Sequence, residues 1–167
     1  MTSFKDIYNE DKENGPFENA SLNNYTIVFS PDEQIALAKD ALIQKANKFF
    51  IPPLEIGDLK SNILARIDER FNVYAIWVDG NLMYIGETKD IKARLRQHLL
   101  CCSDSTDSKF EEIQRESRKG GKIEVSLIEV QPSAFRLAVE DSLICALTEG
   151  DPSALPWNTK ARHDASL

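Results

Sequence analysis

The sequence predicts an α+β domain in which helices flank a small, three-stranded antiparallel sheet. Two segments with helical periodicity come first, two short strand-like segments joined by a tight turn follow, and further helical segments enclose a third strand-like segment. Because only a short turn joins the two consecutive strands, they are expected to pair antiparallel. This order of elements is typical of an α+β fold and not of a doubly wound parallel sheet.

The N-terminal part of the chain is predicted to have two sections. Residues 1–24 are polar, which indicates a mobile tail. Residues 25–70 are expected to form an N-terminal helical extension, because helical patterns occupy 31–49 and about 58–69. The first of these helices begins at a capping-box sequence, Ser30-Pro31-Asp32-Glu33.

Residues 71–160 carry the other predicted elements. The segments Val73–Val78 and Leu82–Ile85 are rich in β-branched and aromatic residues, and Asp79-Gly80-Asn81 between them favours a hairpin turn. The next expected element is a helix capped by Thr88, with Ile91, Leu95 and Leu99 on its buried face. It is expected to be followed by a loop at 103–108, a helix at 110–118, a strand at 123–130, a helix from about 133 to 147 and a C-terminal tail at 161–167.

The charge of the 167-residue chain is unevenly distributed. A net charge of −7 does not by itself favour a nucleic-acid-binding protein, whose binding surface is usually basic. Residues 71–120, however, hold 8 basic and 8 acidic side chains, whereas 1–70 and 121–167 are both net acidic. The helix that follows the hairpin carries several lysines and arginines, so any cationic surface is expected there.

Several classes of protein are excluded by composition. No apolar run approaches the roughly 20 residues that span a bilayer, and the N-terminus lacks the pattern of a signal peptide, so a cytoplasmic protein with no membrane contact is expected. The three cysteines have no regular spacing, which does not indicate a disulfide framework. With no CxxC pair and only two histidines, a Cys/His zinc site is not expected either.

Four polar residues around the predicted hairpin are candidates for chemistry. Tyr74 and Tyr84 lie on its two strands, so their hydroxyl groups can emerge near one another. Arg94 and His98 are four residues apart on the next helix and therefore share a face. Two phenols, a guanidinium and an imidazole can thus meet at one end of the hairpin. The planar guanidinium is suited to the geometry of a phosphate.

The same segment resembles the GIY-YIG nuclease family. Its first motif corresponds to Asn72-Val73-Tyr74, with asparagine in place of glycine, and its second motif is intact as Tyr84-Ile85-Gly86. The resemblance covers residues 72–160, and its downstream polar residues follow in the family's order as Arg94, His98, Glu140 and Asn158. With Arg94 and His98 counted as one element, five elements in the right order make this resemblance specific, whereas Tyr-Ile-Gly alone would not.

The resemblance implies metal-dependent hydrolysis of DNA phosphodiester bonds. Glu140 is the implied ligand of a divalent cation, Mg²⁺ or Mn²⁺, which neutralises charge on the scissile phosphate. Arg94 is implied to donate to the phosphate in the transition state. Basic residues of the same helix, Lys89, Lys92 and Arg96, are expected to contact DNA.

A tyrosine is implied to take the proton from the attacking water. We expect Tyr74 to be this base and Tyr84 to be its partner at the phosphate, with the reverse assignment left open. Because the ordinary pKa of tyrosine is about 10, a cation or a hydrogen bond to the phenolate has to lower it. His98 is expected to hydrogen-bond within the tyrosine pair or to phosphate, and Asn158 to brace the site.

Taken singly, these residues have ordinary structural interpretations. The two tyrosines can be half-buried strand aromatics, His98 a core histidine, and Asn158 a turn residue. Glu140 can pair with Arg136 on a solvated helix face. Their joint order favours the functional interpretation.

Three functions are consistent with this sequence. The first is a sequence-specific endonuclease of the restriction type, because no separate DNA-binding module is evident; such enzymes commonly act as homodimers or higher homo-oligomers. The second is a structure-specific or repair-type nicking nuclease whose partner supplies affinity for DNA. The third is a non-catalytic binding module on the same fold.

Overall fold

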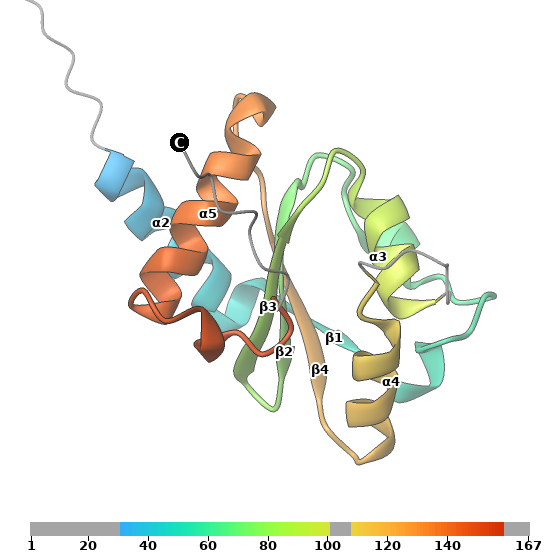
Figure 1. The fold of residues 1–167 in the computed structure, drawn as a ribbon. Coiled ribbons are helices and arrows are strands. Elements are labelled where there is room, and N and C mark those ends of the chain that lie inside the picture. The colour runs from blue at the N-terminus through green and yellow to red at the C-terminus, as the bar shows by residue number, and fades with distance from the viewer. Residues whose placement is uncertain (1–30, 101–107, 159–167) are drawn as a thin grey trace, which may run out of the picture. The chain divides into compact units, whose positions relative to one another are not determined.

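Four strands form one antiparallel sheet in the order β1-β4-β2-β3 (Figure 1). The computed structural model describes residues 31–100 and 108–158. The bounds of the strands are Lys48–Ile51 for β1, Val73–Val78 for β2, Asn81–Glu87 for β3 and Ile123–Ile128 for β4. The predicted α+β class with a small antiparallel sheet is therefore confirmed, with four strands in place of three.

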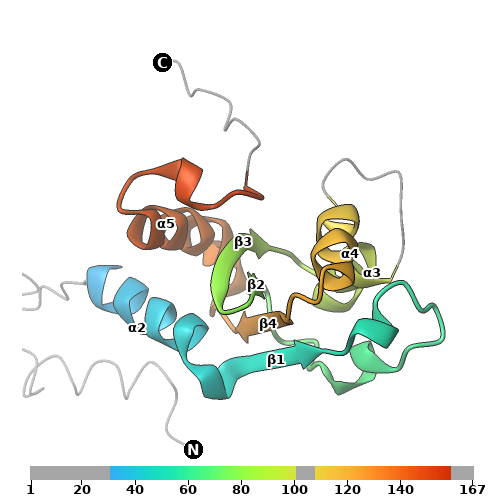
Figure 2. The ribbon, with the colours of Figure 1, turned by 90° about the horizontal axis from the view of Figure 1, so that it is seen from below.

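Helices cover both faces of this sheet, as Figure 2 shows. Helices α2 (Pro31–Ile43) and α5 (Arg136–Thr148) pack against one face, and α3 (Ile91–Leu99) and α4 (Phe110–Arg118) lie against the other. None of the helices within the described ranges is long and apolar enough to cross a membrane.

Strand β2 lies inside the sheet and is buried on both faces. Successive side chains of a strand point to opposite faces of the sheet. Alternate residues of β2 therefore belong to two different hydrophobic cores. On the α2/α5 face the β2 residues are Val73, Ala75 and Trp77. On the α3/α4 face they are Tyr74, Ile76 and Val78.

Strand β1 is the strand that was not predicted, because the first helix was expected to continue into its residues. Helix α2 stops at Ile43, and the side-chain amide of Asn47 donates to the carbonyl oxygen of Ala41 at 2.7 Å. Lys48–Ile51 then pairs antiparallel with β4. The prediction over 31–49 was wrong at its C-terminal end, because pairing with a distant strand decides the conformation of these few residues.

The second predicted helix, over 58–69, is also corrected. The structure has only a short 3₁₀ turn at Ile63–Arg66. Side chains compete with the helical backbone here, because Asp58 accepts from the amide of Lys60 and the hydroxyl of Ser61 accepts from the amide of Ile63. Ile63, Leu64 and Ile67 of the segment are nevertheless buried, whereas Leu59 is 67% exposed.

Several predicted boundaries shift by a few residues. The N-cap of α3 is Asp90, whose carboxylate accepts from the amide of Ala93 at 2.9 Å, and not Thr88. Strand β3 is longer than expected and β4 is two residues shorter. The expected tails at 1–24 and 161–167, the cap residue Ser30 and most of the loop at 103–108 lie outside the described residues.

Candidate active site

Tyr74 and Tyr84 lie on the same face of the β2–β3 pair. Tyr74 is directly opposite Gly86, and Tyr84 is directly opposite Ile76. The two tyrosines are therefore diagonal neighbours, and their ring centroids are 5.9 Å apart. A Cβ atom on Gly86 would lie 2.5 Å from the Tyr74 hydroxyl oxygen and 2.7 Å from Cε1 of Tyr84, so only glycine leaves room for this arrangement.

Helix α3 brings Arg94 and His98 to the Tyr74 hydroxyl group. His98 Nε2 is 2.7 Å from the hydroxyl oxygen, and Arg94 Nε donates to the same oxygen at 3.1 Å. The His98 ring also lies 5.6 Å from the ring centroids of both Tyr74 and Tyr84. The structure thus brings together four of the predicted site residues in direct contact.

The tautomer of His98 follows from its second contact. The backbone N–H of Lys109 donates to Nδ1 of His98 at 2.9 Å. Burial, followed by the positive charges of Arg94 and Lys109, lowers the pKa of His98 to about 3, so the ring is neutral near pH 7. A neutral ring that accepts at Nδ1 carries its proton on Nε2 and therefore donates to Tyr74.

The Tyr74 hydroxyl oxygen consequently receives two donated hydrogen bonds. Both donors favour the phenolate over the phenol. Burial, and then the neighbouring Tyr84, raise the pKa of Tyr74 well above its ordinary value, while Arg94 lowers it. Without further positive charge, Tyr74 is therefore a neutral phenol.

Lys109 is a site residue that was not anticipated. It precedes α4, is only 9% exposed, and its Nζ lies 5.6 Å from the centroid of the Tyr84 ring. Eleven residues separate it from His98, a spacing that fits no regular helix or strand contact. Only the packing of α4 beside α3 brings the two together, so the sequence offered no signal for it.

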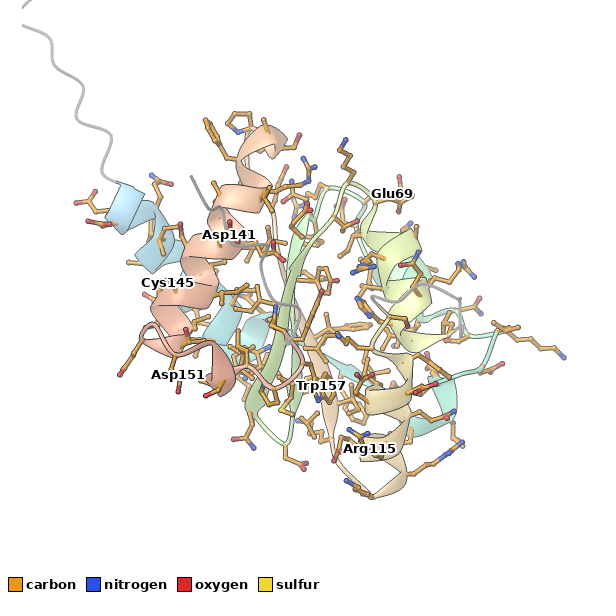
Figure 3. The ribbon with its side chains drawn as sticks, in the orientation of Figure 1. Glu69, Arg115, Asp141, Cys145, Asp151 and Trp157 are labelled. Atoms are coloured by element: carbon orange, nitrogen blue, oxygen red, sulfur yellow. The ribbon has the colours of Figure 1, made fainter. Side chains whose placement is uncertain are left out.

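Asn158 lies at the outer edge of β3. Its side chain accepts from the amide of Ile85 at 2.9 Å and donates to the carbonyl oxygen of Ile85 at 2.7 Å. The amide of the preceding residue, Trp157, donates to the carbonyl oxygen of Met83 at 3.1 Å (Trp157 is labelled in Figure 3). Asn158 thus holds the backbone between Tyr84 and Gly86 and does not touch the tyrosine hydroxyl groups.

Asn72 has a comparable role at the start of β2. Its side chain donates to the carbonyl oxygen of Val130 at 3.0 Å and accepts from the amide of Val130 at 2.8 Å. Both groups are buried, and the pair continues the β2–β4 ladder beyond its last strand residue. Asparagine at the position of the motif's first glycine is therefore accommodated by the fold.

Glu140 lies in the layer opposite to the tyrosines. It is half-buried on α5, beside Asp141, which Figure 3 labels. Arg136, one turn earlier, forms an ion pair with Glu87 at the end of β3. Because α5 runs antiparallel beside β3 (Figure 1), one helical turn of about 5 Å brings Glu140 level with the last residues of the Tyr84-Ile85-Gly86 motif.

The three predicted DNA-contacting residues, Lys89, Lys92 and Arg96, lie at or near the solvent-facing side of α3. Lys89 and Arg96 are exposed. Lys92 is about one-third exposed and forms an ion pair with Glu69 at 3.0 Å. Lys92 and Arg96 belong to α3, and Lys89 lies just before it.

Residues 70–147 match the family model of the GIY-YIG catalytic domain. This part of the chain belongs to the GIY-YIG nuclease family. The match includes both tyrosines, Arg94, His98 and Glu140, while Asn158 lies beyond its end. Comparisons with curated proteins and with solved structures give no match.

A GIY-YIG domain is a nuclease domain, and it implies a DNA substrate. Nucleases of this family generally depend on a divalent metal. The residues described here contain no group of three or more His, Cys, Asp or Glu side chains that could hold an ion, so they provide no ligand cage of the zinc type. One half-buried carboxylate, Glu140, fits Mg²⁺ or Mn²⁺, which keep several water ligands and also bind substrate phosphate.

Proposed function

We propose that this protein is a metal-dependent DNA endonuclease in which Tyr74 accepts the proton of the attacking water. The observation that supports this function most directly is the pair of donors on the Tyr74 oxygen, Arg94 Nε and His98 Nε2. A tyrosine that is only part of a hydrophobic core needs one hydrogen-bond partner. Two donors, one of them charged, are suited to stabilise a phenolate.

In this proposal each group has a separate task. Tyr74 holds the proton taken from water, and neutral His98 keeps its own proton on Nε2 as a donor throughout. Arg94 stabilises negative charge, both on the phenolate and on the phosphate. A divalent cation held by Glu140 would supply the positive charge that lowers the pKa of Tyr74 and neutralises the scissile phosphate.

The choice of Tyr74 over Tyr84 as base rests on these contacts. The donors Arg94 Nε and His98 Nε2 both reach the Tyr74 oxygen, while Tyr84 is partly exposed. Replacing Tyr74 by Phe is expected to reduce single-turnover cleavage about 10²–10⁴-fold. Replacing Tyr84 by Phe is expected to cost less, and the opposite order would exchange the two roles.

We further propose that cleavage is sequence-specific and of the restriction type. In this proposal three basic residues at or just before α3, Lys89, Lys92 and Arg96, contact the DNA backbone, and two or more copies act together to cut both strands. Because contacts between these basic side chains and phosphates drive the binding, its affinity is expected to fall as the salt concentration rises.

The test is a digest of long duplex DNA with Mg²⁺ at low salt. Wild type is compared with Glu140→Gln and with Glu111→Gln, an exposed residue of α4 that controls for the change in charge. Discrete fragments from wild type and Glu111→Gln, but not from Glu140→Gln, are expected. Nicking of branched DNA alone would favour a repair-type nuclease, and no cleavage of any DNA by the folded protein would favour a binding module.

A further inference from the structure

Lys109 places an ammonium group beside the two tyrosines, and the mechanism above does not use this group. Lys109 is only 9% exposed, and its Nζ lies 5.6 Å from the centroid of the Tyr84 ring. Lysine is rarely this buried without a partner of opposite charge. Such a position indicates that the charge has a use.

Nothing in the described part of the chain neutralises this charge. The ion pairs found there involve other lysines and arginines, and none includes Lys109. Two groups of the site do not neutralise it either, because Arg94 is a cation and His98 is neutral. The aromatic face of Tyr84 compensates for only a small part of the cost of burying an ammonium.

Two cations that converge on neutral partners form a site for an anion. Arg94 reaches the site from α3, and Lys109 reaches it from the start of α4. A compact ammonium is a point charge that binds phosphate oxygens well. Bound phosphate would supply the negative charge that the described residues do not.

We propose that the Lys109 ammonium is a further catalytic residue, which donates to a non-bridging oxygen of the substrate phosphate beside Tyr84. The inference rests on the proposed nuclease function and adds a second fixed cation to it. In this assignment Arg94 donates to the phosphate from the side of Tyr74, and Lys109 donates to it from the side of Tyr84. Both stabilise the charge that develops as the phosphodiester is attacked.

The two parts of Lys109 can be separated by mutation. Its backbone N–H fixes the tautomer of His98, and its side chain carries the charge. Lys109→Met retains the backbone amide and most of the aliphatic length, so it removes the charge alone. Lys109→Arg retains the charge, and Lys119→Met is the matched control, because Lys119 is an exposed lysine at the other end of α4 that pairs with Glu116.

The experiment measures single-turnover cleavage of duplex DNA with Mg²⁺, and DNA binding over a salt series in the Glu140→Gln background. Lys109→Met is expected to slow cleavage about 100-fold. It is also expected to reduce the slope of log affinity against log salt by about one. Lys109→Arg is expected to recover most of both effects, and Lys119→Met is expected to match wild type.

Three results would overturn the proposal. Cleavage by Lys109→Met at the wild-type rate would remove Lys109 from the reaction and leave the nuclease function standing. A change in the ¹⁵N shift of His98 Nδ1 in Lys109→Met would show that the side chain acts by positioning His98. If wild type does not cleave DNA, the proposed function fails first, and an unchanged salt slope in Lys109→Met then removes the phosphate contact as well.

Discussion

Gly86 is the residue on which the geometry of the two tyrosines depends most directly. The Tyr74 ring crosses β3 at this position, where a Cβ would lie 2.5 Å from its hydroxyl oxygen and 2.6 Å from Cζ. Neither atom can move away easily, because the same oxygen is held by Arg94 and His98. Gly86→Ala is therefore expected to displace Tyr74 and to reduce cleavage about 100-fold or more.

The same substitution should cost about 1–3 kcal/mol in the free energy of unfolding, measured by urea denaturation, because it overpacks a buried site. Gly80→Asn is the control. Gly80 has a positive φ of 80° and nothing within 4 Å of an added Cβ, and asparagine tolerates that conformation. Equal activity of Gly86→Ala and wild type would contradict the role given to this glycine.

His98 makes the stability of the protein depend on pH. Its pKa is about 3 in the folded protein and near 6.5 in an unfolded chain, so between these values the unfolded state binds more protons. The free energy of unfolding is therefore expected to fall as the pH is lowered through this window. At pH 5, His98 is expected to lower the free energy of unfolding by about 2 kcal/mol relative to neutral pH.

Urea denaturation at pH 7.5 and pH 5, for wild type and His98→Gln, measures this contribution. The carboxylates titrate in both proteins, so the difference between the two pH dependences isolates His98. An NMR titration that found the midpoint of His98 near pH 6.5 in the folded protein would show that the ring is not buried as a neutral donor.

At the scale of elements, asparagine side chains extend the sheet at two places. Asn72 pairs with the backbone of Val130 beyond the end of β4, and Asn158 pairs with the backbone of Ile85 at the outer edge of β3. Each side-chain amide makes one donated and one accepted hydrogen bond, as the backbone of a neighbouring strand would. The edge strand that carries Tyr84-Ile85-Gly86 is held in place by Asn158.

Asn158→Ala is expected to loosen β3 without unfolding the protein. Losing both bonds to Ile85 should cost about 1–3 kcal/mol in the free energy of unfolding. Hydrogen exchange of the Ile85 amide is expected to speed up about tenfold or more, and cleavage to fall while DNA binding is retained. Asn62→Ala, at an exposed turn, is the control. Unchanged exchange at Ile85 would refute the bracing role.

At the scale of the whole molecule, residues 31–70 contribute to the core around the catalytic motifs. Strand β1 forms one edge of the sheet, and Leu42 of α2 is buried against β2 and α5. Two tryptophans report on the two cores, since Trp77 lies on the α2/α5 side and Trp157 packs on the α3/α4 side. Both cores are therefore expected to unfold together.

Ile51→Ala in β1 tests this coupling. Ile51 is fully buried, so truncation should cost about 2–5 kcal/mol and shift the tryptophan fluorescence and far-UV circular dichroism transitions equally. Phe50→Ala on the same strand is the matched control, because Phe50 is half-exposed and its loss should matter less. An unchanged tryptophan transition in Ile51→Ala would show that this segment folds separately.

The fold class, the hairpin and the residues of the GIY-YIG motifs could all be predicted from the amino-acid sequence alone. These features are encoded locally: a run of β-branched and aromatic residues marks β2, Asp79-Gly80 marks the turn, and the spacing of Arg94 and His98 places them on one helical face. The joint order of the two tyrosine motifs, Arg94 with His98, Glu140 and Asn158 along the chain indicated the family.

The contacts that these residues make could not be predicted, because they depend on how distant elements pack. Strand β1 was missed because four residues acquire their conformation from a partner more than 70 positions away in the sequence, namely β4. The proton on His98 Nε2, the approach of Lys109 to Tyr84 and the clearance over Gly86 depend on distances between elements, which local periodicity does not encode. Local sequence determines most helices and strands of this protein, and packing between them determines which polar groups contact one another.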